Sequence, residues 1–336
     1  MVNLTPLDIF SLAVYCTTIT LGSPSNAVAL CVFLRELKRK PTPNVIYMIN
    51  LCVSDSLFIA LLPVKVVETV WGEWALPPVF CPIYNVFHFS TIYTSVLFLT
   101  ALSMGRYLSV AFPIKYKLYK RPCYSCLVCF SLWFLVIAHI AFIFLVAATG
   151  SRDHLVAPGQ GNASICYANF TQAQLELLVP LRMELAIVFF VAPLALTSFA
   201  CLGCFRELGQ SQLPRRKKGK ALRVVAVTLV TFVVCFAPYN ASHLAGLVLR
   251  RDISWRREAL LPSTASALLN PLVFFLSSTA LQQSAVQCWR SAEQHVRDIK
   301  ESPQRIWHSA MPQGKGVDGG PTQASEKRRV QTTAID

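Results

Sequence analysis

Charged side chains are scarce in this sequence, and acidic ones are scarcer than basic ones. Only 14% of its 336 residues are charged and 54% are hydrophobic, whereas about a quarter of an average soluble domain is charged. This deficit excludes an ordinary soluble protein and predicts an integral membrane protein. The 17 acidic residues leave a net charge of +14. Because the basic residues lie in short loops between apolar runs, we expect the lipid bilayer, and no nucleic acid, as a partner.

The sequence also lacks a catalytic or cofactor-binding constellation, so we expect no enzyme. Cys123, Cys126 and Cys129 have the spacing of metal ligands, but no histidine or acid stands near them. We interpret them as packing residues rather than as a zinc or iron–sulfur site. Gly159-Gln160-Gly161 lacks the strand and helix that surround a nucleotide-binding loop. No basic segment precedes the first apolar run, so we expect no cleavable signal peptide.

Seven apolar runs are long enough to cross a bilayer, whose core of about 30 Å needs roughly 20 residues at 1.5 Å each. They cover approximately residues 9–34, 43–70, 81–113, 123–148, 177–205, 221–249 and 259–279. We therefore predict an all-α membrane protein, with a seven-transmembrane helix bundle over residues 9–279 that follows an extracellular N-terminus of residues 1–8. We expect residues 280–302 to form a membrane-surface helix and residues 303–336 a disordered cytoplasmic tail.

The distribution of loop charges predicts the orientation of the bundle. Loops after the first, third and fifth runs are rich in Lys and Arg, which places them in the cytoplasm and the N-terminus outside. Cys81 and Cys166 then both face the oxidising side, so a disulfide between them is plausible. The sequence contains four sequons, and the one at Asn240 lies inside the sixth run. The other three fall on the outer side, where glycosylation is expected: Asn3, Asn162 and Asn169.

Each of the seven runs contains a residue or motif that matches the rhodopsin-like G-protein-coupled receptors. In chain order these are Asn26, Asp55, Arg106, Trp133, Pro193, Pro238 and Asn270-Pro271. Within that class the chain resembles the free fatty acid receptors, in the strings at residues 112–117, 166–170, 178–185 and 235–243. The similarity covers about Leu12 to Ser278. It implies a plasma-membrane receptor for free fatty acids that signals through Gi or Gq family heterotrimeric G proteins, or both, with arrestin as a further partner.

The resemblance assigns Arg106 and Tyr107 to G-protein coupling, but the surrounding pattern departs from the class. Gly105 stands where an acid usually precedes this arginine, so the ion pair that commonly restrains the arginine cannot form. We therefore expect Arg106 to be less restrained and the protein to signal measurably without ligand. Phe274 replaces the tyrosine of the NPxxY motif, and Cys201 stands where the fifth helix usually offers a tyrosine. Both changes remove active-state partners of the arginine.

Two arginines on the predicted outer side are candidates for binding a carboxylate. Arginine offers a planar, bidentate donor array and stays charged when partly desolvated. From the residues alone, Arg182 can also be a snorkelling side chain and Arg256 a solvated loop charge. The resemblance assigns both to the ligand carboxylate, which also explains the cluster of arginines that breaks the loop-charge rule at 250–257.

The resemblance places further residues in the ligand pocket, and for the histidines an interhelical hydrogen bond is the alternative. These residues are His243, Tyr239, His139, Tyr93 and His88. His243 and the Cys166-Tyr167 loop are similar to short-chain members of the family. Gly105, His88 and residues 121–125 are more similar to the long-chain member. We favour short-chain over medium- or long-chain acids.

Asp55, Ser95 and Asn270 match the residues around the allosteric sodium ion of this receptor class. An isolated buried aspartate is costly, so a cation or proton must accompany it. Two other functions stay open. One is a rhodopsin-like receptor for another small anionic ligand, and the other is a monocarboxylate transporter, although the sequence has no internal repeat and no paired broken helices.

Overall fold

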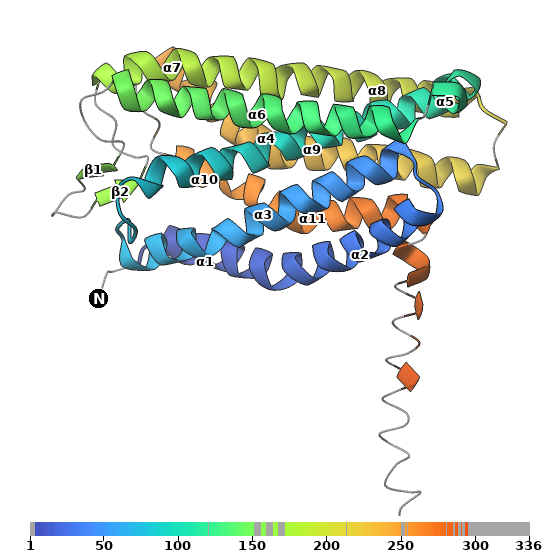
Figure 1. The fold of residues 1–336 in the computed structure, drawn as a ribbon, viewed down its shortest axis with the longest axis horizontal. Coiled ribbons are helices and arrows are strands. Elements are labelled where there is room, and N and C mark those ends of the chain that lie inside the picture. The colour runs from blue at the N-terminus through green and yellow to red at the C-terminus, as the bar shows by residue number, and fades with distance from the viewer. Residues whose placement is uncertain are drawn as a thin grey trace, which may run out of the picture. The chain divides into compact units, whose positions relative to one another are not determined.

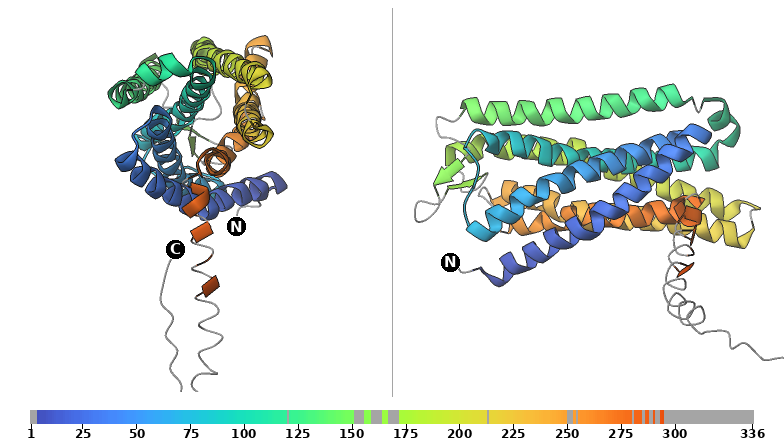
Figure 2. Two further views of the ribbon diagram at one scale, coloured as in Figure 1. Left: turned by 90° about the vertical axis from the view of Figure 1, so that its right-hand side faces the viewer. Right: turned by 60° about the horizontal axis from the view of Figure 1, so that its bottom comes forward.

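Long apolar helices form the body of the protein. The structure, a computed structural model, describes residues 4–119, 121–150, 156–158, 164–166, 172–212, 214–249, 253, 255–279, 281–284, 286–287, 290 and 293–294. Within these residues, seven candidate membrane spans are found, at Pro6–Arg39, Pro43–Trp71, Phe80–Ala111, Pro122–Leu145, Leu178–Gln210, Arg215–Leu249 and Arg256–Leu276. They run side by side (Figure 1) and are seen end-on in the left view of Figure 2. The predicted seven-helix bundle is confirmed.

The spans are divided into shorter elements. The helices are α1 (Pro6–Thr17), α2 (Ser23–Arg39), α3 (Pro43–Trp71), α4 (Phe80–Ala111), α5 (Pro113–Tyr119), α6 (Pro122–Gly150), α7 (Gln172–Ala186), α8 (Ala192–Gln210), α9 (Arg215–Leu249), α10 (Arg256–Ala259) and α11 (Leu261–Ser277). The bundle lies in the first of two compact units, Met1–Ala285 and Val286–Asp336.

Two spans contain a π turn directly before a proline. The turn η1 (Thr18–Gly22) joins α1 to α2 ahead of Pro24, and η2 (Ile187–Val191) joins α7 to α8 ahead of Pro193. Proline has no N–H to donate, and its ring clashes with the carbonyl four residues earlier, so the preceding turn widens. An apolar window predicts each span as one run and does not detect this division.

The central helix of the bundle is α4. In its most apolar stretch 78% of the residues are buried, against 28% for the span Pro122–Leu145. This difference explains why α4 carries many polar side chains that pack inward, while α6 exposes apolar ones such as Phe130 and Phe134. An exposed apolar face of this kind suits contact with lipid.

A short antiparallel hairpin lies at one end of the bundle. Its strands, β1 (Val156–Pro158) and β2 (Ser164–Cys166), pair with Val156 opposite Cys166. The predicted disulfide between Cys81 and Cys166 is present and ties β2 to the start of α4. We call this end, with the hairpin and the disulfide, the hairpin end. At the opposite end, α4 is followed by α5 (Figure 1). Arg106 lies near this end of α4, and we call it the Arg106 end.

The boundaries differ from the sequence prediction in one place that matters. The apolar run begins at residue 221, but α9 begins at Arg215, because lysine and arginine are good helix formers and extend the helix beyond its apolar part. The predicted membrane-surface helix stays a prediction, since the structure describes only scattered residues of 280–302. Three sequons and the tail lie outside the described residues: Asn3, Asn162, Asn169 and 303–336.

The fourth sequon should not carry a glycan. Asn240 is buried in α9, and its Nδ2 donates to the Phe236 carbonyl oxygen at 2.8 Å. We expect Asn240→Gln to leave the mobility shift on enzymatic deglycosylation unchanged, and the double change Asn162→Gln and Asn169→Gln to reduce it. A glycan that disappears only with Asn240 would contradict the placement of α9 inside the bilayer.

Candidate functional site

Three side chains that can carry positive charge meet at one small cavity at the hairpin end. Arg182 comes from α7, His243 from α9 and Arg256 from the first residue of α10. The cavity has a volume of about 10 Å³ and is also lined by Val179, Ser242, Gly246 and Ile253. That is room for about one water molecule. A larger ligand can enter only if the surrounding side chains or helices move.

His243 is the most informative residue of this cluster. Its side chain is only 4% exposed, yet neither ring nitrogen has a hydrogen-bond partner among the described residues. Tyr239, one turn earlier on α9, packs edge-on against the imidazole at 4.5 Å. A buried polar group without a partner is costly. A hydrogen-bonding group in the cavity would remove that cost.

Aromatic rings close the space beside the cluster. Phe89 of α4 stacks on Tyr239 at 5.8 Å and on Phe144 at 6.2 Å. Tyr93 and His139 pack against Phe189, with ring centroids 5.7 and 5.2 Å away. The structure therefore places Tyr239 next to the small cavity, while neither Tyr93 nor His139 lines it.

Two of the predicted pocket histidines have partners elsewhere. The Nε2 atom of His139 lies 3.5 Å from Oε1 of Glu184 on α7. Nδ1 of His88 lies 3.3 Å from the hydroxyl of Tyr84, and the His88 ring packs on Phe58 at 5.0 Å. Both residues form contacts between or within helices. Neither is brought to the cavity of Arg182, His243 and Arg256.

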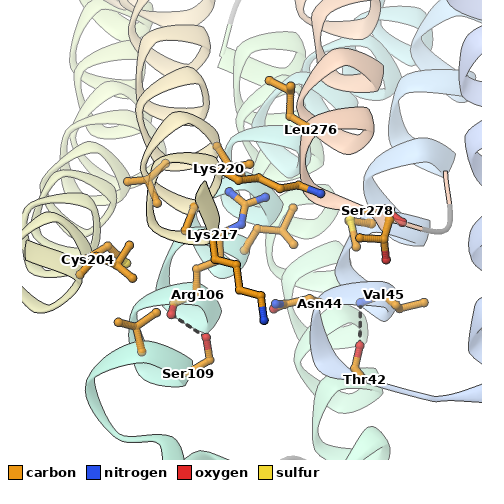
Figure 3. Close-up of a pocket in the computed structure, with 18 of the residues that line it drawn as sticks. Thr42, Asn44, Val45, Arg106, Ser109, Cys204, Lys217, Lys220, Leu276 and Ser278 are labelled. Carbon is orange, nitrogen blue, oxygen red and sulfur yellow. Dashed lines mark hydrogen bonds between the residues drawn. The ribbon is translucent and has the colours of Figure 1, made fainter. Parts of the chain in front are cut away.

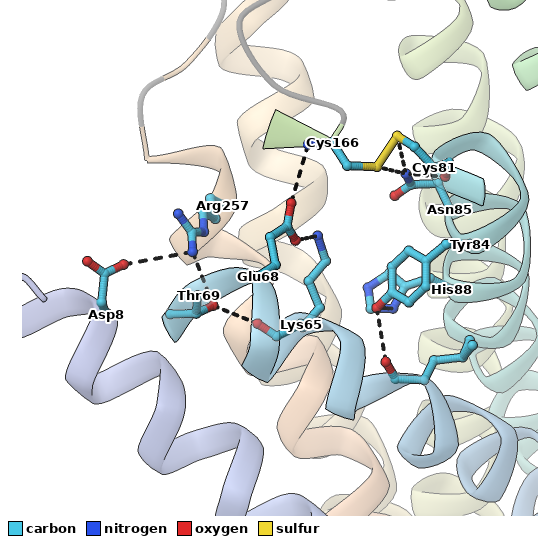
Figure 4. Close-up of polar contacts among 11 residues, drawn as sticks. Asp8, Lys65, Glu68, Thr69, Cys81, Tyr84, Asn85, His88, Cys166 and Arg257 are labelled. Carbon is cyan, nitrogen blue, oxygen red and sulfur yellow. Dashed lines mark hydrogen bonds and ion pairs between the residues drawn. A yellow bond between two sulfur atoms is a disulfide. The ribbon is translucent and has the colours of Figure 1, made fainter. Parts of the chain in front are cut away.

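A polar network fixes the elements around the cluster (Figure 4). Arg257 donates to Thr69 Oγ1 at 3.3 Å and lies 3.8 Å from an Asp8 oxygen, which ties α10 to α3 and α1. On the same end of α3, Glu68 accepts from Lys65 at 2.7 Å and from the backbone N–H of Cys166 at 3.3 Å. This network holds β2 and α10 against α3. Arg257 points to α1 and α3, and its neighbour Arg256 lines the cavity.

The three residues matched to a sodium site do meet in the middle of the bundle. Asp55 is 1% exposed and accepts from Asn270 Nδ2 at 2.9 and 3.1 Å and from Ser95 Oγ at 3.3 Å. Ser95 also donates to Ser54 Oγ at 3.1 Å. The Asn270 Oδ1 atom is buried and has no hydrogen-bond partner among the described residues. Hard cations prefer such oxygen atoms, so the donor set fits a sodium ion.

Arg106 has a partner that the sequence did not reveal. Its Nη1 donates to Thr228 Oγ1 of α9 at 2.7 Å, and the same hydroxyl donates to the Val224 carbonyl oxygen at 2.8 Å. Thr228 is fully buried. Arg106 lines a pocket of about 450 Å³ at the Arg106 end, walled also by Asn44, Lys217 and Lys220 (Figure 3). This bond joins α4 to α9 and restrains Arg106 although no acid precedes it. That Arg106 is less restrained than an acid-paired arginine, with measurable signalling without ligand, stays a prediction.

The residues next to Arg106 are fitted closely to their neighbours. A Cβ atom at Gly105 would lie 2.6 Å from Asn44 Oδ1, so an acid at this position must displace the Asn44 side chain. A Cβ atom at Gly203 of α8 would overlap with the Tyr107 ring. Glycine at these two positions permits the close approach of α3 and α8 to α4. Tyr107 also packs on Phe199 at 5.3 Å.

The matching family model decides the classification of the chain. The model "7 transmembrane receptor (rhodopsin family)" matches residues 25–284. The chain belongs to this receptor family, in its free fatty acid receptor branch. It is 39% identical to Free fatty acid receptor 3 of Mus musculus, covering 80% of this chain and 83% of that protein. It is 38% identical to Free fatty acid receptor 1 of Macaca fascicularis (78% and 89%) and 37% identical to Free fatty acid receptor 2 of Mus musculus (81% and 83%).

This family consists of receptors rather than enzymes, and membership makes the chain a multi-pass protein of the plasma membrane. Several residues of the receptor that matter structurally were not predicted from sequence. Ser242 and Ile253 complete the small cavity, Thr228 binds Arg106, and Glu68 holds β2. Ser242 directly precedes His243 in the sequence, and this adjacency could have indicated that it lines the same cavity. The sequence gives no such indication for Thr228 or Glu68, because a threonine in an apolar run and a glutamate at a helix end are both common for other reasons.

The Glu68 contacts should contribute measurably to the stability of the receptor. Hydrogen bonds to charged groups are worth about 1.5–3 kcal/mol each, and Glu68 is 7% exposed. We expect Glu68→Gln to lower the melting temperature of the purified receptor by several degrees, because it loses the charge that Lys65 and the Cys166 N–H bind. The exposed Glu73 is the control, and Glu73→Gln should melt like the parent. Equal melting of both variants would remove Glu68 from the network.

Proposed function

We propose that this receptor binds the carboxylate of a free fatty acid between Arg182 and Arg256 and transmits binding to a heterotrimeric G protein at the Arg106 end. The convergence of Arg182, His243 and Arg256 from three elements on one cavity carries this proposal. The proposed orientation places the hairpin end outside the cell, as the loop charges predict. The relatives are free fatty acid receptors by name, which supports the class of ligand.

The chemistry of the cluster suits a small carboxylate. A guanidinium group offers paired donors that match two carboxylate oxygens, and in a partly desolvated site it keeps its charge. His243 adds a further nitrogen that lacks a partner in the described structure. Because the cavity is about 10 Å³, bound acid must select or induce a more open arrangement of α7, α9 and α10. An acid that binds the open arrangement more tightly than the closed one shifts the population toward the open one.

The aromatic packing supports a short hydrocarbon tail. Phe89, held between Phe144 and Tyr239, stands beside the cluster on the side of α4. A short acid needs little space beyond the carboxylate. A longer hydrocarbon tail must displace Phe89 or pass out of the bundle between two helices. The names of the relatives give no chain length, so the packing carries this part.

At the Arg106 end, α9 is the element whose movement would open the G-protein site. The Arg106–Thr228 bond joins α4 to α9 and is expected to favour the closed arrangement. Coupling to Gi or Gq, and binding of arrestin, are expectations from the family. A sodium ion would be held by Asp55, Ser95 and the Asn270 oxygen and would neutralise the buried carboxylate.

Two other functions compete with this proposal. A receptor for another small anion would use the same cluster, and a ligand panel separates it. A monocarboxylate transporter would take up labelled acetate without activating a G protein. Membership of the receptor family argues against the transporter.

Loss of either arginine should abolish or strongly weaken the response to fatty acid. Each charge-assisted contact is worth about 1.5–3 kcal/mol, which is roughly tenfold or more in potency. We expect Arg182→Ala and Arg256→Ala to show this loss in G-protein activation at matched surface expression. Arg256→Lys should recover part of it, because the charge stays and the paired donors go. Arg257→Lys is the control for a neighbouring residue and should lose much less, because it keeps a charge that can bind Asp8 and Thr69 and so keeps α10 in place. An unchanged curve for Arg256→Ala would remove it from the site.

Removing the Thr228 hydroxyl should raise ligand-free signalling. Thr228→Val keeps the shape of the side chain but takes away the acceptor of Arg106, a bond to a charged group worth about 1.5–3 kcal/mol. If the bond exists only in the closed arrangement, the active fraction rises roughly tenfold. The active fraction is measured as basal nucleotide exchange on a purified G protein. Thr231→Val, on the same helix, is the control. A fall in basal exchange would assign the bond to the open arrangement instead.

Chain-length preference should change when Phe89 is shortened. In the parent we expect short acids to be the more potent agonists. In Phe89→Ala the potency of medium-chain acids relative to short ones should rise, by about fourfold for each additional methylene that the new space buries, from about 0.8 kcal/mol per methylene. Because the potencies of medium-chain and short acids are compared within one variant, their ratio does not depend on the expression level. An unchanged ratio would show that the tail takes another path.

A further inference from the structure

The most basic part of the described chain lies at the first turns of α9. Six of the nine residues from 215 to 223 are basic, namely Arg215, Arg216, Lys217, Lys218, Lys220 and Arg223. None of the six forms an ion pair with a carboxylate of the described residues. Positive charge in a cytoplasmic loop is the ordinary topology signal, but these residues are helical and five of them share one cavity.

That cavity lies between α9, the last turn of α11 and Gln282. It has a volume of about 690 Å³ and is lined by Arg215, Arg216, Lys217, Gly219, Lys220, Arg223, Val224, Leu276 and Gln282. Its cations are exposed, whereas Val224 is buried and apolar. The walls are therefore basic and part of the floor is apolar. Lys220 Nζ donates to Gln282 Oε1 at 2.9 Å across this space.

The length of α9 places the cavity at the membrane surface. With 35 residues, the helix is about 52 Å long at 1.5 Å per residue, whereas a hydrocarbon core is about 30 Å thick. The apolar part runs from Val224 to Leu249, so the basic first turns extend into the headgroup layer. A soluble anion could reach only the basic walls. A lipid can place phosphates on the cations and its chains beside Leu276 and the apolar helix faces.

We propose that this cavity binds the headgroup of an inner-leaflet lipid that carries more than one phosphate, of the polyphosphoinositide class. The inference rests on the proposed orientation, which puts the Arg106 end in the cytoplasm. Clusters of four to eight basic residues just cytoplasmic of a membrane helix attract such lipids. Five lining cations exceed what the single net charge of a phosphatidylserine headgroup can neutralise, so the number of charges favours a polyphosphate headgroup.

The site is placed to influence G-protein coupling. Lys217, Lys220, Val224 and Leu276 line both this cavity and the pocket around Arg106. In Figure 3 the side chains of Lys217 and Lys220 extend from α9 into the pocket that contains Arg106. A bound headgroup would draw these two lysines to its phosphates. It would thereby change the charge and the space that a G protein meets, without touching the cluster of Arg182, His243 and Arg256.

The test is lipid binding to the purified full-length receptor. The receptor is placed in phosphatidylcholine nanodiscs that contain phosphatidylinositol bisphosphate, or phosphatidylserine at equal total charge, and bound lipid is counted by native mass spectrometry. We expect retention of the bisphosphate lipid over phosphatidylserine. Each cation near the surface is worth about fivefold, so Arg216→Gln with Arg223→Gln should weaken binding roughly thirtyfold. The control, Lys38→Gln with Arg39→Gln, changes two exposed cations of α2 outside the cavity and should bind like the parent.

Two further comparisons distinguish a lipid site from a site for soluble phosphate, and specific binding from general surface charge. Soluble inositol trisphosphate should compete only weakly, because it lacks the acyl chains. Competition equal to that of the lipid would make this a phosphate site and overturn the lipid assignment. Equal retention of phosphatidylserine, or equal loss in the α2 control, would reduce the effect to general surface charge and also overturn it. Binding of labelled fatty acid to the receptor without G protein reports the cluster of Arg182, His243 and Arg256 separately. If Arg216→Gln with Arg223→Gln keeps that binding while losing the lipid, the two proposals stand or fall independently.

Discussion

The placement of positive charge inside an apolar bundle is the constraint on which this structure depends. Arg182 is 6% exposed in a helix that crosses the membrane. A cation in such a position is retained only where it is compensated or used. The elements around it are organised accordingly. The disulfide fixes β2 to α4, Glu68 holds β2 to α3, and Arg257 holds α10 to α1 and α3. These contacts support the element from which Arg256 reaches the same cavity.

The two ends of the receptor are joined by α9. At the hairpin end this helix supplies His243 and Tyr239, in its middle it carries Pro238, and at the Arg106 end it supplies Thr228 and the basic turns. A change at the cluster therefore has a continuous helix through which to act. The buried contacts of Asp55 with Asn270 and Ser95 join α3, α4 and α11 beside it. In the proposed function, a movement of α9 against α4 would be the change that both ends could bias.

Much of the fold was predictable because membrane helices leave a strong signal in composition and length. The seven runs follow from composition, and the pairing of Cys81 with Cys166 from the orientation that the loop charges predict. The meeting of Asp55, Ser95 and Asn270 was implied by the resemblance to the receptor class. The resemblance to the family assigned Arg256 to the carboxylate, and the structure has Arg256 at the cavity and Arg257 on Asp8 and Thr69. The π turns, the hairpin and the helical start of α9 were not predictable from apolar windows, because windows report hydrophobicity and not backbone geometry.

The partner of Arg106 could not be inferred either. Side-chain direction depends on how α4 and α9 are rotated against each other, which one sequence does not specify.

The central claim is that a carboxylate joins Arg182 to Arg256, and the most direct measurement is a structure of the receptor bound to a short-chain fatty acid and a G protein. The claim predicts both carboxylate oxygens at hydrogen-bond distance, about 2.7–3.2 Å, from the guanidinium groups of Arg182 and Arg256. It also predicts a cavity larger than the one described here, and the Arg106–Thr228 bond broken. An acid bound elsewhere, with Arg182 and Arg256 unchanged around a closed cavity, would contradict the claim.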